Sequence, residues 1–149
     1  KPGRDAVRPG CRCLVVDGHS VLFRRPPGGR RAVPGSKARQ QLVDLLQQAQ
    51  DHGGVKVAVV FDGRGGQPSL QKPGEVEVRY AARHQTADAL IERAVAACGR
   101  PETITVVTDD AGEASTLGML GADVIGVEHF FSLVREACPG WVLERYESA

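Results

Sequence analysis

The chain has 149 residues, of which 42% are hydrophobic and 25% are charged, and its formal net charge at pH 7 is +1. This length and composition predict one globular domain and exclude long disordered segments. No apolar run approaches the roughly 20 residues that span a bilayer, and the first residues lack the apolar segment of a signal peptide. We therefore expect a cytoplasmic protein with no membrane partner.

Basic residues are concentrated at the start of the chain. Residues 1–40 contain ten Lys or Arg and two acidic residues, whereas residues 41–149 contain nine Lys or Arg and sixteen acidic residues. A segregated basic segment attracts polyanions, of which the phosphate backbone of a nucleic acid is the commonest. A solvated basic tail explains the same pattern equally well.

Short β-branched runs alternate with amphipathic helical patterns along the chain. In chain order, the expected elements are a strand over 13–16, a helix over 39–50, a strand over 57–61, a short strand over 76–80, a helix over 86–98, a strand over 104–107, a helix over about 111–120, a strand over 123–127 and a helix over about 128–137. Thr86 and Gly99 give the clearest helix start and stop signals. This alternation predicts an α/β fold, a single-domain three-layer α/β/α sandwich with a mostly parallel sheet.

Two stretches rich in Gly, Pro and Arg, over 24–37 and 63–74, are too polar to pack and are expected to be loops. Residues 141–146 fit either a final strand or an arm. The expected organisation is a basic N-terminal extension over 1–10, one domain over 11–138 and a C-terminal tail over 139–149.

Acidic residues follow each of the three clearest strands. Asp17 follows the first strand, Asp62 the second, and Asp109 and Asp110 the third. Side chains at the carboxyl ends of neighbouring parallel strands meet in one crevice, where ligands bind. Each aspartate alone fits a turn former, but the repetition favours a shared site.

The helix over 86–98 adds two further acids, Asp88 and Glu92, at a spacing of four residues. Like charges at this spacing repel each other by roughly 0.2–0.5 kcal/mol. Asp88 also fits a residue that complements the helix dipole, and Glu92 a solvated side chain. If these acids join the strand ends, the cluster must take up protons or bind a cation.

A cluster with only oxygen ligands suits Mg²⁺ or Mn²⁺. The chemistry that follows is hydrolysis of a phosphodiester, in which the metal activates water and offsets the charge of the transition state. His19 is expected to lie beside this site. It either contacts substrate or has a structural role in the loop and its packing. Ser20 is expected to support the site by a hydrogen bond to Asp17 or to a metal-bound water.

Several other site types are excluded because their motifs are absent. The chain has no G-x-G-x-x-G or Walker A sequence, so no nucleotide cofactor is expected. It has no G-x-S-x-G, and the first strand is not followed by two aspartates separated by one residue. Zinc-finger spacing is also absent, and reduced thiols are expected at Cys11, Cys13, Cys98 and Cys138.

With these motifs in view, the chain resembles the YacP-like branch of the NYN-domain nucleases, in the PIN-like superfamily. The residues that carry the resemblance are LVVDGHS over 14–20, VAVVFDG over 57–63, TAD over 86–88 with IE at 91–92, and VVTDD over 106–110. The resemblance implies a PIN-like, Rossmann-like domain and a ribosome-associated endoribonuclease that uses Mg²⁺ or Mn²⁺. RNA, and specifically mRNA on the ribosome, is the partner that it implies.

The resemblance also implies roles for individual acids. Asp17, Asp88 and Asp110 match the family's metal-binding acids, and Asp62 completes the expected catalytic set. The expected supporting residues are Ser20, Glu92 and Asp109. One departure is that the family's first motif commonly reads D-G-Y-N, whereas this chain has His19 and Ser20.

Phosphate contacts are expected from arginines, which fix the position of RNA without reading its sequence. The candidates are Arg24, Arg25, Arg30, Arg31 and Arg83. Two other functions remain open: an RNA or ribosome adapter of the same fold that does not cut, and a phosphatase or phosphodiesterase for small nucleotides.

Overall fold

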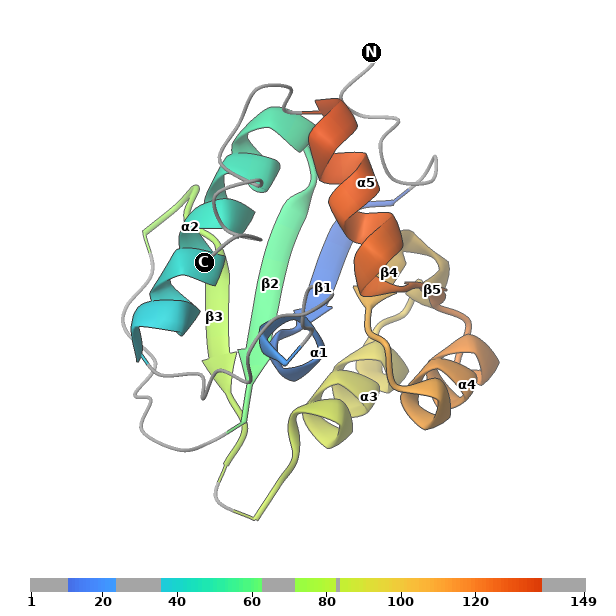
Figure 1. Cartoon of the computed structure of the whole chain (residues 1–149). Helices are drawn as coiled ribbons and strands as arrows, with labels where there is room; N and C mark the ends of the chain where they lie inside the picture. The colour runs from blue at the N-terminus through green and yellow to red at the C-terminus, as the bar shows by residue number, and fades with distance from the viewer. Residues whose placement is uncertain (1–10, 24–35, 63–71, 83, 138–149) are drawn as a thin grey trace.

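The computed structural model describes residues 11–23, 36–62, 72–82 and 84–137, which form an α/β fold around a five-stranded sheet. The strands are all parallel and lie in the order β3-β2-β1-β4-β5 (Figure 1). In chain order the elements are β1 (Cys13–Asp17), α1 (Gly18–Leu22), α2 (Ser36–Gly53), β2 (Lys56–Phe61), β3 (Glu77–Tyr80), α3 (Ala87–Ala97), the 3-10 helix η2 (Pro101–Thr103), β4 (Ile104–Val107), α4 (Ala111–Met119), β5 (Asp123–Ile125) and α5 (Val127–Ala137). No helix in the described ranges is long and apolar enough to cross a membrane.

Helices cover both faces of the sheet, and each face has its own hydrophobic core. On one face, Val16 and Val59 pack with residues of α1, α2 and α5. On the opposite face, Val60 and Val106 pack with residues of α3 and α4. Neighbouring residues such as Val59 and Val60 point to opposite faces because side chains alternate along a strand. The predicted three-layer sandwich is therefore confirmed, and Figure 1 shows α2 and α5 lying across the same face.

The topology brings the ends of β1 and β4 together at the centre of the sheet. From β1 the chain moves outward to β2 and β3, and then returns to β4 on the other side of β1. In the β1 register, Val16 lies beside Val59 of β2 and Val107 of β4. The residues that follow these strands therefore share one edge, and the order reverses between β1 and β4. Such a reversal is where open α/β sheets bind ligands.

The strand and helix predictions are confirmed, but the expected end of the last strand is wrong. β5 ends at Ile125 rather than at Val127. The carbonyl of Gly126 accepts a hydrogen bond from Phe130 N at 3.0 Å, so the chain has already entered α5 at this point. A β-branched residue such as Val127 fits a strand by preference, and here the helical hydrogen bonds override that preference.

Two helical segments were not predicted, and one predicted loop is shorter than expected. α1 and η2 are new, with five and three residues respectively. α2 begins at Ser36, inside the loop expected over 24–37. The rest of that loop and most of the loop over 63–74 lie outside the described residues. The extension over 1–10 and the tail over 139–149, including 141–146, also lie outside them.

Gly18 allows α1 to start directly against β2. A Cβ atom on Gly18 would lie 2.5 Å from Phe61 Cδ1 and 3.0 Å from the Val60 carbonyl oxygen. We expect Gly18→Ala to lower the free energy of unfolding by about 1–3 kcal/mol, because the core cannot make room without shifting backbone. Chemical denaturation measures this change. The control is Gly53→Ala at the end of α2, where a Cβ meets no atom within 4 Å, and equal losses in both variants would contradict the prediction.

Candidate active site

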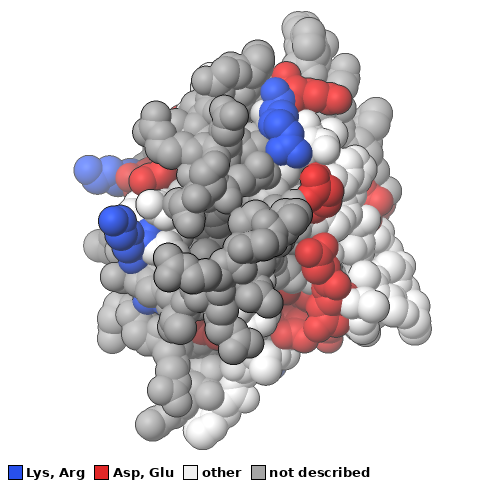
Figure 2. Space-filling view, in the orientation of Figure 1, with Lys and Arg blue, Asp and Glu red and all other residues white. Residues whose placement is uncertain are grey.

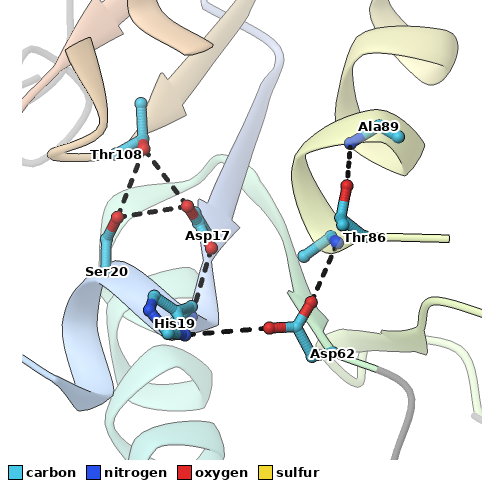
Figure 3. A network of polar contacts seen from close by, with 8 residues as sticks. Asp17, His19, Ser20, Asp62, Thr86, Ala89 and Thr108 are labelled. Carbon is cyan, nitrogen blue, oxygen red and sulfur yellow. Dashed lines mark hydrogen bonds and ion pairs between the residues drawn. The ribbon is translucent and has the colours of Figure 1, made fainter. Parts of the chain in front are cut away.

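The acids that end β1 and β2 each accept a hydrogen bond at a helix start. Asp17 caps α1, because its Oδ1 accepts from the backbone N of His19 at 3.1 Å. Asp62 Oδ1 accepts from Ala87 N at 3.0 Å and so holds the first turn of α3 (Figure 3). A helix N-terminus carries partial positive charge, which offsets repulsion between carboxylates gathered at this edge.

The two acids that follow β4 act on two different helices. Asp110 caps α4, with its Oδ1 2.9 Å from Glu113 N. Asp109 Oδ1 accepts from Val127 N at 2.9 Å, at the start of α5. All four strand-end acids therefore hold helix starts, and all four lie at the same edge of the sheet. Each aspartate therefore has a structural role at a helix start rather than in a turn, and a site shared by these acids stays a prediction.

Asp17 lies at the centre of a buried hydrogen-bond network. Its side chain is only 5% exposed. Its Oδ2 accepts from Ser20 Oγ at 3.1 Å and from Thr108 Oγ1 at 3.2 Å, and the two hydroxyls are 3.2 Å apart (Figure 3). The expected contact between Ser20 and Asp17 is present. Ser20 Oγ also accepts from Asp109 N at 3.1 Å, so it links the ends of β1 and β4.

Glu113, in the first turn of α4, was missed by the sequence analysis. It is only 2% exposed, and its Oε1 lies 2.7 Å from Thr108 Oγ1. Its Oε2 is buried and has no hydrogen-bond partner among the described residues. Burial raises the pKa of Glu113 to about 8; the Thr108 hydrogen bond opposes this shift, and the charges of Asp17 and Asp88 add to it. At neutral pH, this carboxyl is therefore largely protonated.

The hydroxyl of Thr108 shows why Glu113 holds a proton. This hydroxyl carries one hydrogen, yet its oxygen lies within hydrogen-bond distance of both Asp17 Oδ2 and Glu113 Oε1. If both carboxyls were ionised, they would compete for that single hydrogen. If Glu113 is protonated, it donates to Thr108, and Thr108 donates to Asp17. Removal of this proton therefore leaves a negative charge that only a cation can compensate.

The acids of α3 lie at the border of this network. Asp88 and Glu92 are both half-buried. Asp88 is close enough for its charge to raise the pKa of Glu113, which places it in the same electrostatic group as Asp17. Glu92 does not enter the hydrogen-bond network around Asp17 among the described residues. Figure 2 shows acidic side chains gathered on the visible face over the region of α3 and α4.

The donor chemistry fits a hard divalent cation. Asp17, Glu113 and Asp88 offer only oxygen atoms, and one oxygen of Glu113 is buried with no hydrogen-bond partner in the described part of the chain. Among the residues that the structure describes, no three His, Cys, Asp or Glu side chains are arranged to hold a metal ion together. Asp62 and Asp110 are exposed, and their hydrogen bonds go to helix starts. The acids therefore lie near one another without forming a coordination shell.

The arginines expected to bind RNA cannot be assigned a place in this site. All five lie outside the described residues: Arg24, Arg25, Arg30, Arg31 and Arg83. The contribution of these arginines to phosphate binding stays a prediction.

Comparisons with known proteins agree with this fold. A family model described as the YacP-like NYN domain matches residues 14–140. A crystal structure of Rae1 (YacP) from Bacillus subtilis is 28% identical to this chain, with a TM-score of 0.68, and covers 83% of this chain and 73% of its own. Its W164L mutant is 27% identical, with a TM-score of 0.67 and coverage of 83% and 74%. A search of curated proteins finds no match. The chain belongs to the YacP-like NYN domain family, which is a family of nuclease type.

Proposed function

We propose that this protein is a Mg²⁺- or Mn²⁺-dependent endoribonuclease that hydrolyses phosphodiester bonds of RNA. The observation that carries the proposal is the buried pair of Asp17 and Glu113 at the switch point of the sheet. The two carboxyls share one hydroxyl hydrogen, and burial keeps Glu113 protonated near neutral pH. A buried acid pair of this kind at a ligand crevice is a candidate functional site rather than a stability device.

The proposed metal ligands are Asp17, Asp88 and Asp110, and we add Glu113 to this proposal because it is buried beside Asp17. A divalent ion held by these residues would polarise the phosphate and activate water for hydrolysis. An ionised Glu113 would add a second buried negative charge to that of Asp17. Asp110 is the N-cap residue of α4, and Glu113 lies in the first turn of the same helix.

Other residues of the chain hold these acids in place. Ser20 and Thr108 donate to Asp17, so they fix the direction of its carboxylate. Asp62 holds the first turn of α3, which carries Asp88. Glu92 and Asp109 are proposed to support the site. The proposed substrate is ribosome-bound mRNA in the cytoplasm, as the family resemblance implies.

One observation favours a second candidate function. The described carboxylates are not gathered into a coordination shell, and Asp17 Oδ2 is occupied by two hydroxyl contacts. A module that binds RNA or the ribosome through the same fold and does not cut would have the same features. The two candidates differ in metal-dependent cleavage, which can be measured directly.

We expect the wild-type protein to cut labelled single-stranded RNA with Mn²⁺ and to stop when EDTA is added. Asp88→Asn is expected to cut at least ~10–100-fold more slowly, because it removes one charge from the metal site and keeps the side chain's size. The matched control is Asp51→Asn, an exposed acid in the last turn of α2. This control should cut at the wild-type rate.

Cleavage that is equal in wild type and Asp88→Asn would refute the catalytic role of Asp88. Wild-type protein that binds RNA without cutting it would instead support the adapter. Hydrolysis of a small nucleotide substrate without any cut in RNA would favour the phosphodiesterase that the sequence left open.

A further inference from the structure

An exposed aromatic side chain lies at the end of α1. Phe23 is the C-cap residue of this helix and is 49% exposed. Among the described residues, the only other large hydrophobic side chain with such exposure is Met119, at the far end of α4. Single exposed apolar side chains are common on protein surfaces, so the groups beside Phe23 matter more than its exposure.

Phe23 forms a ring pair with His19. The two residues are four apart, so they lie on the same face of the helical turn. Their ring centroids are 4.3 Å apart, and the ring planes are tilted by 33°. The side chain of His19 is also exposed, by 56%. Together the two rings form an exposed aromatic surface that no described residue covers fully.

This aromatic pair is attached to the acidic edge of the sheet. His19 N donates to Asp17 Oδ1 at 3.1 Å, and His19 Nδ1 lies 3.7 Å from Asp62 Oδ2. Figure 3 shows His19 below Asp17 and to the left of Asp62, with a dashed line from His19 to each of them. Because Asp17 caps the helix that carries both rings, the pair has a defined position relative to the candidate active site.

We propose that His19 and Phe23 stack on an unpaired base of the RNA strand that enters the acidic site. This inference rests on the proposed nuclease function and names the form of its substrate. An aromatic ring stacks on any base, because every base has a π face, so the contact selects single strands rather than sequences. In a duplex the bases already stack on each other, and the ring pair has nothing to bind.

The test measures binding without cleavage. Kd is determined in EDTA by fluorescence anisotropy for three probes of equal length: a single-stranded RNA, the same RNA as a duplex, and an abasic strand with phosphates but no bases. We expect Phe23→Leu to raise Kd for the single strand about tenfold, because leucine keeps the apolar volume and loses the flat ring. Kd for the duplex and the abasic strand should not change. Phe23→Tyr should bind like wild type, and so should the control Met119→Leu.

Three results would overturn the stacking proposal. The first is that Phe23→Leu binds the single strand as tightly as wild type does, which would leave Phe23 for a protein partner. The second is an equal loss of affinity for all three probes, and the third is that wild type does not bind the single strand. The cleavage assay with Mn²⁺ is read separately. If wild type cuts RNA and Phe23→Leu does not change the affinity for the single strand, the stacking is refuted and the nuclease proposal stands. If binding depends on Phe23 but no RNA is cut, the nuclease proposal is refuted and the stacking contact stands.

Discussion

Asp17→Asn is expected to lower the rate of Mn²⁺-dependent RNA cleavage by more than ~100-fold and to keep the fold. Loss of a group that only supports a metal ligand typically costs 10–100-fold, so loss of the charge on a ligand should exceed that range. Asparagine keeps an oxygen that can accept from His19 N, which preserves the cap of α1. The new amide hydrogens face the hydroxyls of Ser20 and Thr108, which can rotate to accept them.

A second measurement separates loss of metal binding from loss of structure. Thermal unfolding is followed with and without Mn²⁺, because a ligand that binds only the folded state raises Tm. Wild type and the control Asp51→Asn should gain Tm on addition of Mn²⁺, and Asp17→Asn should gain little. If Asp17→Asn gains as much Tm as wild type and still cuts RNA, Asp17 is not part of a metal site.

Glu113→Gln is expected to remove a large pH dependence of stability in the metal-free protein. The folded-state pKa of Glu113 is about 8, against an ordinary value of 4.5. Between these values the folded state binds more protons than the unfolded state, so stability falls as pH rises. The contribution is fully present below about pH 4.5 and is lost by about pH 8. Its size is at most on the order of 5 kcal/mol.

This prediction is checked by the free energy of unfolding at pH 5, 7 and 9 in EDTA. Wild type should lose stability relative to Glu113→Gln as pH rises, since glutamine has no proton to release. All other titrating groups contribute equally to both proteins, so they cancel in the difference between the two free energies of unfolding. Addition of Mn²⁺ at pH 9 should restore the free energy of unfolding of wild type and leave that of the variant nearly unchanged. Parallel curves for both proteins would show that Glu113 is ionised in the folded state.

Much of the fold was predictable because its strands are buried on both faces. Continuous β-branched runs such as Val57 to Val60 indicate such strands, and the helices between them show a clear period. Parallel strands then place the residues that follow them at one edge. For this reason the convergence of Asp17 with the end of β4 could be predicted without any structure.

Two parts of the site could not be predicted. α1 has only five residues, too few for a helical period to be visible, and so Phe23 and His19 were not recognised as neighbours. Glu113 has a signal, because it follows Asp110 at the spacing of a capping box. That signal predicts a side chain that bonds back to Asp110 N, but Thr108 Oγ1 occupies that donor at 3.1 Å. Glu113 instead turns inward, and burial of an acid has no signature in sequence.

The pair Asp109 and Asp110 joins the two helical layers of the molecule. Through adjacent carboxylates, one peptide unit holds the first turn of α4 on one side of the sheet and the first turn of α5 on the other. The end of β4 therefore connects the starts of two helices that lie on opposite faces of the sheet.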